Sequence, residues 1–119
     1  DVYKRQINTR ISYLYRDANN YKMQNSCVIM GVITETQIAE IISCLDCGEY
    51  FIPRQVGLPE KRFDRFDEEA DHCWFELSAD GFEATENASN TDMTVSQLLE
   101  LFHRAKNNWH DEVPLGGAV

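Results

Sequence analysis

The chain has 119 residues, with 43% hydrophobic and 26% charged side chains and a formal net charge of −9. This composition is ordinary for one globular domain, and the negative charge argues against direct binding to nucleic acid, whose phosphates would be repelled. No apolar run approaches the roughly 20 residues that cross a bilayer, so we expect no membrane span. Four cysteines are too few for a secreted disulfide framework, so we expect a cytoplasmic protein.

The net charge lies in the second half of the chain. Residues 1–59 hold six acids and six bases, whereas residues 60–119 hold fourteen acids and five bases. Between Asp64 and Asp92 there are ten carboxylates, and Arg65 is the only base. Charge of one sign repels itself, so such a block is typical of a solubilising face, a cation site or a surface for a basic partner.

The N-terminus carries a run that resembles a cloning sequence. Residues 1–6 match one reading frame of the transposon end that is used to tag DNA libraries, and we interpret them as a non-native adapter scar outside the fold. The alternative is a native basic lead-in to the first strand. We expect one globular α+β domain over residues 7–112 and a flexible tail over residues 113–119.

Two strands are predicted at the start of this domain. Residues 11–16 alternate, with an isoleucine and two tyrosines on one face, which is the pattern of a strand with one buried face. A second strand is expected over residues 26–33; residues 27–30 are apolar on both faces, which favours a central position in the sheet. The turn-rich residues 17–20 predict a hairpin between the two.

Two helices share one start signal. Thr34 and Gln37 form a capping box, in which each side chain accepts the backbone amide of the other residue, and Thr94 and Gln97 repeat it. Gly48 is expected to end the first helix, and the second should end near residue 107 or 108. The apolar stripes are Ile38, Ile41, Ile42 and Leu45 in the first helix and Leu98, Leu99, Phe102, Ala105 and Trp109 in the second.

A second hairpin is predicted between the helices. Cys73, Phe75 and Leu77 alternate with polar or larger side chains, and Asp80-Gly81 predicts a tight turn before a strand at residues 82–85. The chain therefore reads ββαββα. We expect an α+β fold in which two β-hairpins form a mainly antiparallel four-stranded sheet, with both helices on one face.

The segment from Glu49 to Phe63 is too long for a simple connector. Two interpretations stay open: it covers an open end of the core, or it docks a partner. In the docking hypothesis it acts with the acidic block at residues 64–71 on a basic protein surface. The predicted partner-binding residues are Tyr50, Phe51, Ile52, Arg54, Asp67, Glu68, Glu69 and Asp71.

Cys44 and Cys47 form a C-x-x-C, which is typical of a redox pair or of half a zinc site. They lie at the end of a predicted helix, where the helix dipole disfavours the thiolate, so we expect no redox catalysis. Zinc needs about four ligands, and His72 and Cys73 are the outside candidates to complete the set. The alternative is that the cysteines fill the core. We expect no metal and no cofactor.

No sequence signature of catalysis is present. The chain lacks a nucleophile elbow, a phosphate-binding loop and a zinc-protease motif, and the acids at residues 64–71 do not have the spacing of a calcium loop. We therefore expect a small, acidic, non-catalytic interaction protein. Three alternatives stay open: a DNA mimic that inhibits a DNA-binding protein, a small domain stabilised by zinc, and an enzyme of unknown reaction.

Four short runs carry a resemblance to other proteins: residues 8–10, 15–17, 48–53 and 56–59, which read NTR, YRD, GEYFIP and VGLP. Through them the chain resembles small proteins of unknown function encoded in gut-bacterial genomes, often near mobile elements. The resemblance implies a bacterial source. It implies no activity, site or cofactor.

Overall fold

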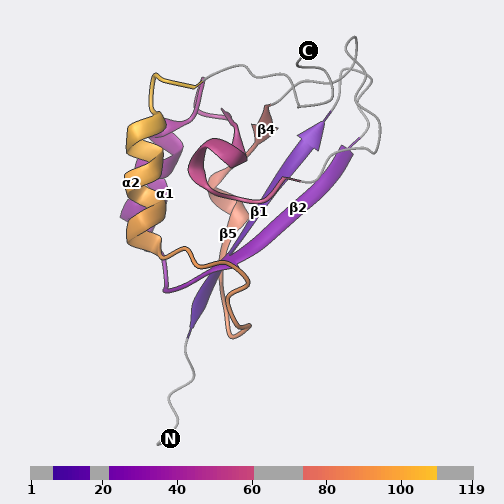
Figure 1. Ribbon diagram of the computed structural model, residues 1–119, viewed down its shortest axis with the longest axis vertical. Helices are drawn as coiled ribbons and strands as arrows, with labels where there is room; N and C mark the ends of the chain where they lie inside the picture. Colours follow the sequence, from indigo (N-terminus) through magenta and orange to yellow (C-terminus); the bar gives the residue numbers. More distant parts are fainter. Residues whose placement is uncertain (1–6, 17–21, 61–73, 110–119) are drawn as a thin grey trace, which may run out of the picture.

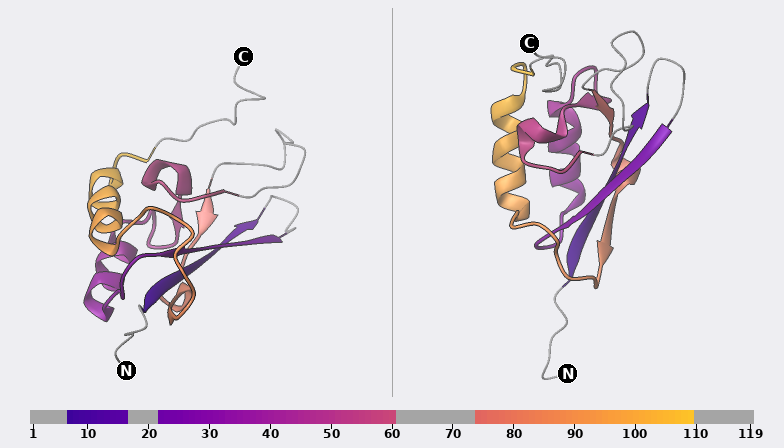
Figure 2. Two further views of the ribbon diagram at one scale, coloured as in Figure 1. Left: turned by 60° about the horizontal axis from the view of Figure 1, so that its bottom comes forward. Right: turned by 45° about the vertical axis from the view of Figure 1, so that its right-hand side comes forward.

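The computed structural model describes residues 7–16, 22–60 and 74–109. The strands form one antiparallel sheet, and both helices lie on one face of it (Figure 1; Figure 2). The predicted α+β class is thus confirmed. The elements are β1 (Asn8–Arg16), β2 (Lys22–Ile29), α1 (Glu35–Cys44), β3 (Tyr50–Phe51), the 3-10 turn η1 (Pro53–Val56), β4 (Phe75–Glu76), the 3-10 turn η2 (Ala79–Gly81), β5 (Phe82–Thr85) and α2 (Val95–Ala105).

β1 is the central strand of the sheet. β2 pairs antiparallel with one of its edges, as the predicted first hairpin requires. The other edge of β1 has two partners in succession: β4 pairs with Leu14 and Tyr15, and β5 pairs with residues 8–11. β3 then pairs with the far side of β4, so the sheet has five strands instead of the expected four.

The predicted second hairpin is wrong. β4 and β5 both run antiparallel to β1, and therefore run in the same direction as each other. The expected tight turn at Asp80-Gly81 is replaced by η2, which carries the chain onward along β1. A side chain at Gly81 would collide with the backbone carbonyl of Ser12, so only glycine allows this close approach. The expected order ββαββα also lacks β3, which arises inside the segment assigned as a loop.

β2 does not lie in the centre of the sheet, as its apolar residues predicted, and it spans Lys22–Ile29 instead of residues 26–33. Its outer edge is covered by the chain that leads into α2. Asn90 forms hydrogen bonds with both backbone groups of Val28. Its side-chain Oδ1 accepts from the Val28 backbone amide (2.9 Å), and its backbone amide donates to the Val28 carbonyl (3.1 Å). This cover explains why residues on both faces of the strand are buried.

Both helices begin at the predicted capping boxes. The Gln37 amide donates to Thr34 Oγ1 (3.1 Å) and the Thr34 amide to Gln37 Oε1 (2.9 Å), and Thr94 and Gln97 repeat these contacts at the same distances. The predicted ends are wrong. α1 ends at Cys44, because Leu45 is already extended and Gly48 belongs to the turn that follows, and α2 ends at Ala105.

The core is an aromatic cluster centred on Phe51. This ring lies 5.4 Å from Tyr13 of β1 and 5.7 Å from Phe102 of α2, measured between centroids. Trp109 also packs against it, at 6.4 Å. The segment that carries Phe51 is held by hydrogen bonds at both ends, from Leu77 N to the Glu49 carbonyl and from Tyr13 Oη to the Pro59 carbonyl. Residues 49–60 therefore complete the core.

The capping boxes make the first prediction. Thr34→Ala and Thr94→Ala should each lower the free energy of unfolding by about 1 kcal/mol, because each removes the acceptor of an otherwise unpaired amide. Urea unfolding followed by circular dichroism measures the change. Thr36→Ala is the matched control, since Thr36 is exposed in the first turn of α1 but caps nothing. An equal loss in Thr36→Ala would mean that the caps contribute nothing specific.

The second prediction concerns alkaline pH. Burial raises the pKa of the Cys27 thiol to about 11, and burial beside Cys27 also raises the pKa of Tyr13. Both groups stay neutral in the folded chain at a pH where they ionise in the unfolded chain. Their contribution to the free energy of unfolding is therefore fully present below about pH 9 and is lost as the pH rises through 11. The thiol alone accounts for on the order of 2–3 kcal/mol.

We therefore expect Cys27→Ala to show a shallower fall of unfolding free energy between about pH 8 and 10.5 than the parent protein. Cys47→Ala, which alters an exposed cysteine, should keep the parent slope. Equal slopes in the parent and Cys27→Ala would show that the Cys27 thiol is not responsible.

Candidate functional site

An apolar concavity lies between α1 and η2. It has a volume of about 700 Å³ and is lined by Glu35, Ile38, Ala39, Ile42 and Ser43 of α1 and by Ala79 and Phe82 on the opposite side. We call it the α1–η2 groove. Ile38, Ile42 and Phe82 pack against the core with one side of each side chain and remain partly exposed on the other.

Two acids lie at or next to this groove. Glu35 lines it, and the exposed Asp80 follows the wall residue Ala79 in the sequence. Residues 26–53 contain four carboxylates and residues 74–103 contain six, and neither segment contains a lysine or an arginine. These segments supply α1, η2 and all of α2 except Arg104 and Ala105, and α1 contacts both η2 and α2. The groove is therefore apolar inside and negative at its rim.

Part of this acidic charge is neutralised on the other face of the sheet. Arg10 Nη1 pairs with Glu83 Oε1 at 3.1 Å, and Arg16 Nε pairs with Glu76 Oε2 at 3.0 Å. Both arginines alternate with the buried residues of β1 and so point away from the helices. The two faces of the sheet thus differ in charge, and the paired face is the less attractive one for a cation.

The predicted docking residues are separated by the fold. Phe51 and Ile52 are fully buried, so they stabilise the core and offer no surface to a partner. Tyr50 is half-buried, and Arg54 is exposed on η1, where its backbone amide donates to the Glu60 carboxylate at 2.7 Å. The acidic residues Asp67, Glu68, Glu69 and Asp71 lie outside the described residues.

The described residues do not bring together a set of ligands for the predicted zinc site. Cys44 is buried at the end of α1 and Cys47 is exposed in the following turn, while His72 and Cys73 lie outside the described residues. Within residues 7–16, 22–60 and 74–109, no three side chains of histidine, cysteine or acid type come together as a metal site would require. A zinc site at these cysteines stays a prediction.

Cys44 does meet one unexpected neighbour. Its Sγ lies 3.8 Å from His103 Nδ1, and His103 Nε2 lies 3.3 Å from Glu40 Oε2. A thiol, an imidazole and a carboxylate in series is the arrangement of an activated nucleophile. Here, however, Cys44 is 1% exposed and its carbonyl accepts the indole N–H of Trp109, so no substrate reaches the sulfur. The contacts join α1 to α2.

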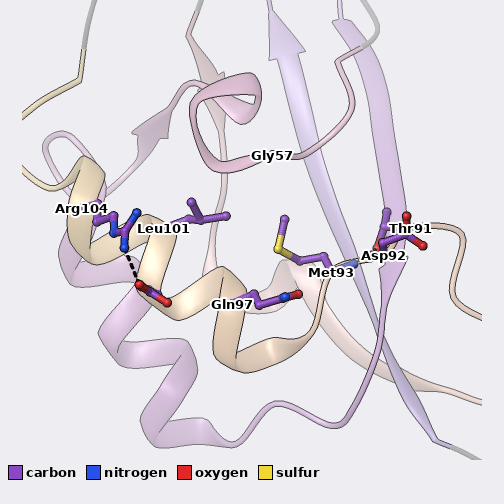
Figure 3. Close-up of a pocket in the computed structure, with 8 residues that line it drawn as sticks. Gly57, Thr91, Asp92, Met93, Gln97, Leu101 and Arg104 are labelled. Atoms are coloured by element: carbon purple, nitrogen blue, oxygen red, sulfur yellow. Dashed lines mark hydrogen bonds and ion pairs between the residues drawn. The ribbon is translucent and has the colours of Figure 1, made fainter.

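A second hollow lies along α2. It measures about 710 Å³, and Figure 3 shows Met93 and Leu101 between Arg104 at one end and Asp92 at the other. Its polar groups already have structural roles: Gln97 belongs to the capping box, and Arg104 pairs with Glu100 at 2.6 Å. Gly57 of the predicted docking segment also lines it. Its lining includes two acids, Asp92 and Glu100, and one base, Arg104, and it is more polar than the lining of the α1–η2 groove.

The α1–η2 groove could not be recognised from the sequence because Ile38 and Ile42 were assigned with Ile41 to one core stripe. At 3.6 residues per turn, the apolar residues of α1 cover an arc of roughly 160°, from Ile41 through Ile38 and Ile42 to Ala39. One packed face takes up less than this. The width of this apolar arc was the feature of the sequence that could have indicated an exposed apolar surface on α1. The contribution of Phe82 was hidden by the wrong hairpin.

Comparison of the chain with protein-family models, curated proteins and solved structures finds no significant match. Over the part of the chain that the structure describes, neither helix has the length and apolar character of a membrane span. The function must therefore be argued from the surface of the molecule.

The different environments of the cysteines make the third prediction. Cys47 should react with iodoacetamide within minutes under native conditions, because it is exposed, whereas Cys27 and Cys44 should react only after unfolding. Peptide mapping by mass spectrometry assigns each label, and Cys47→Ser should remove the fast reaction at this site. Labelling of Cys44 as fast as that of Cys47 would show that the end of α1 opens readily.

Proposed function

We propose that this protein is a small, acidic, non-catalytic interaction module that binds a basic protein surface. The observation that supports the proposal is the acidic charge of α1, η2 and α2, which together carry four carboxylates (Glu35, Glu40, Asp80 and Glu100) and one arginine, Arg104. Like charges crowded on one region destabilise the free protein. A cationic partner neutralises that repulsion, so the acidic charge favours binding of a basic protein.

The acidic block at residues 64–71 belongs to the same proposal. It connects in sequence to the segment that carries Tyr50 and Arg54, and it adds Asp67, Glu68, Glu69 and Asp71 to the charge available to a partner. Opposite charge mainly raises the rate of association and sets its orientation, whereas buried apolar contacts supply most of the affinity.

The fourth prediction removes the charge at three places. The rim variant E35Q/D80N and the block variant D67N/E68Q/E69Q/D71N should each retain at least about threefold less basic protein from a bacterial lysate, because both weaken electrostatic attraction. The variant E76Q/E83Q is the matched control for the rim variant: it also loses two carboxylates, but on the sheet face opposite the helices. It should retain as much as the parent.

Retained proteins are quantified by mass spectrometry at 50 and 300 mM NaCl, and the strongest are purified and measured as pairs. Binding should fall at the higher salt, since screening weakens exposed charge pairs. Unchanged retention by both the rim and block variants would overturn the proposal. If the retained proteins bind DNA and duplex DNA displaces them, the alternative hypothesis of a DNA mimic is favoured.

A further inference from the structure

The residues of α1 that line the groove are regularly spaced along one side of the helix. Glu35, Ile38, Ala39, Ile42 and Ser43 follow the spacing i, i+3, i+4, i+7 and i+8, so they form one straight stripe along the helix axis. The stripe is about 12 Å long at 1.5 Å per residue. It is a second face of α1, distinct from Ile41, which is fully buried against the core.

The floor of this groove is apolar, whereas its rim is acidic, so the two parts favour different groups on a partner. Ile38, Ile42 and Phe82 keep apolar surface in water, and covering that surface is favourable at about 25 cal/mol per Å². Glu35 and Asp80 at the rim favour cations. We infer that the basic partner of the function proposed above docks here as an amphipathic helix, with an aliphatic stripe on the groove floor and lysine or arginine beside the two carboxylates.

Two other occupants fit less well. A second copy of this chain would bring another net charge of −9 against the same acidic rim. An extended strand could pair with the outer edge of β5, which has no strand partner among the described residues. That edge is only four residues long and carries Glu83, whereas the apolar ridge of α1 has the repeat of a helix and is matched by another helix.

The fifth prediction compares two arginines on the same helix. Ala39→Arg puts a long cationic side chain into the groove without deleting a core contact, because Ala39 is exposed. Thr36→Arg makes the same change of charge at an exposed position outside the groove. The probe is a fluorescein-labelled peptide of about 18 residues, made of leucine and lysine with the leucines on one helical stripe.

Fluorescence anisotropy gives the dissociation constant of each pair. Ala39→Arg should weaken binding of this probe at least about tenfold and Thr36→Arg less than about threefold. A peptide of the same composition with leucine and lysine in strict alternation, which is the pattern of a strand, should bind at least about tenfold more weakly. Urea unfolding confirms that both variants are folded.

Each other result overturns the inference in a different way. Equal weakening by both arginines would mean that net charge alone attracts the probe, so the proposed function would stand without the groove. Equal or tighter binding of the alternating peptide would favour strand pairing at β5. Amide shifts in NMR spectra that cluster along α2 would place the site in the other hollow. No binding at low salt, even with the parent protein, would remove the groove inference, and unchanged lysate retention by the charge variants would remove the proposed function itself.

Discussion

The structure depends on the way in which β1 is paired. One of its edges carries a single partner, β2, and the other carries two short partners that follow each other along the strand. Between β4 and β5 the chain bends out through η2, and Gly81 touches the backbone of β1. A continuous partner strand would have left no such bend. The bend places Ala79 and Phe82 opposite α1 and so creates one wall of the groove.

The other wall follows from the packing of the two helices. α1 contacts α2 through Glu40, Cys44 and His103, and it contacts the core through Ile41. Its third side, with Ile38, Ala39 and Ile42, faces the edge formed by η2 and Phe82 across the groove. A ten-residue helix with so wide an apolar arc cannot bury all of it against one sheet and one neighbouring helix. The partly exposed apolar surface is thus a consequence of the fold.

Local signals in the sequence predicted the local structure well. The capping boxes at Thr34 and Thr94 and the buried face of β1 depend on residues a few positions apart, and these predictions are confirmed. The pairing of β4 and β5 depends instead on β1, some sixty or more residues away. The tight turn at Asp80-Gly81 was plausible by itself, and no local pattern shows that the next strand returns to β1.

The same distinction applies to the candidate site. Charge is a property of composition, so the excess of acids could be read directly, whereas Phe51 and Ile52 were predicted to bind a partner. Whether a partner or the core covers them is decided by tertiary packing, and the core does, with both residues fully buried. The apolar surface that remains partly exposed on α1 and Phe82 comes from residues outside the predicted docking set.

In the proposed function, charge and shape have separate tasks. Acids alone would attract any cation, and the attraction would be weak and sensitive to salt, because exposed charges are screened over about 10 Å. An apolar groove alone would favour association of the protein with itself. In the proposed function, the carboxylates discourage self-association and orient a basic partner, while Ile38, Ile42 and Phe82 supply contacts that salt does not screen. On the opposite face of the sheet, Arg10 and Arg16 are paired with acids, so the charge of Glu83 and Glu76 is partly neutralised there. The proposal therefore assigns binding to the helix-bearing side.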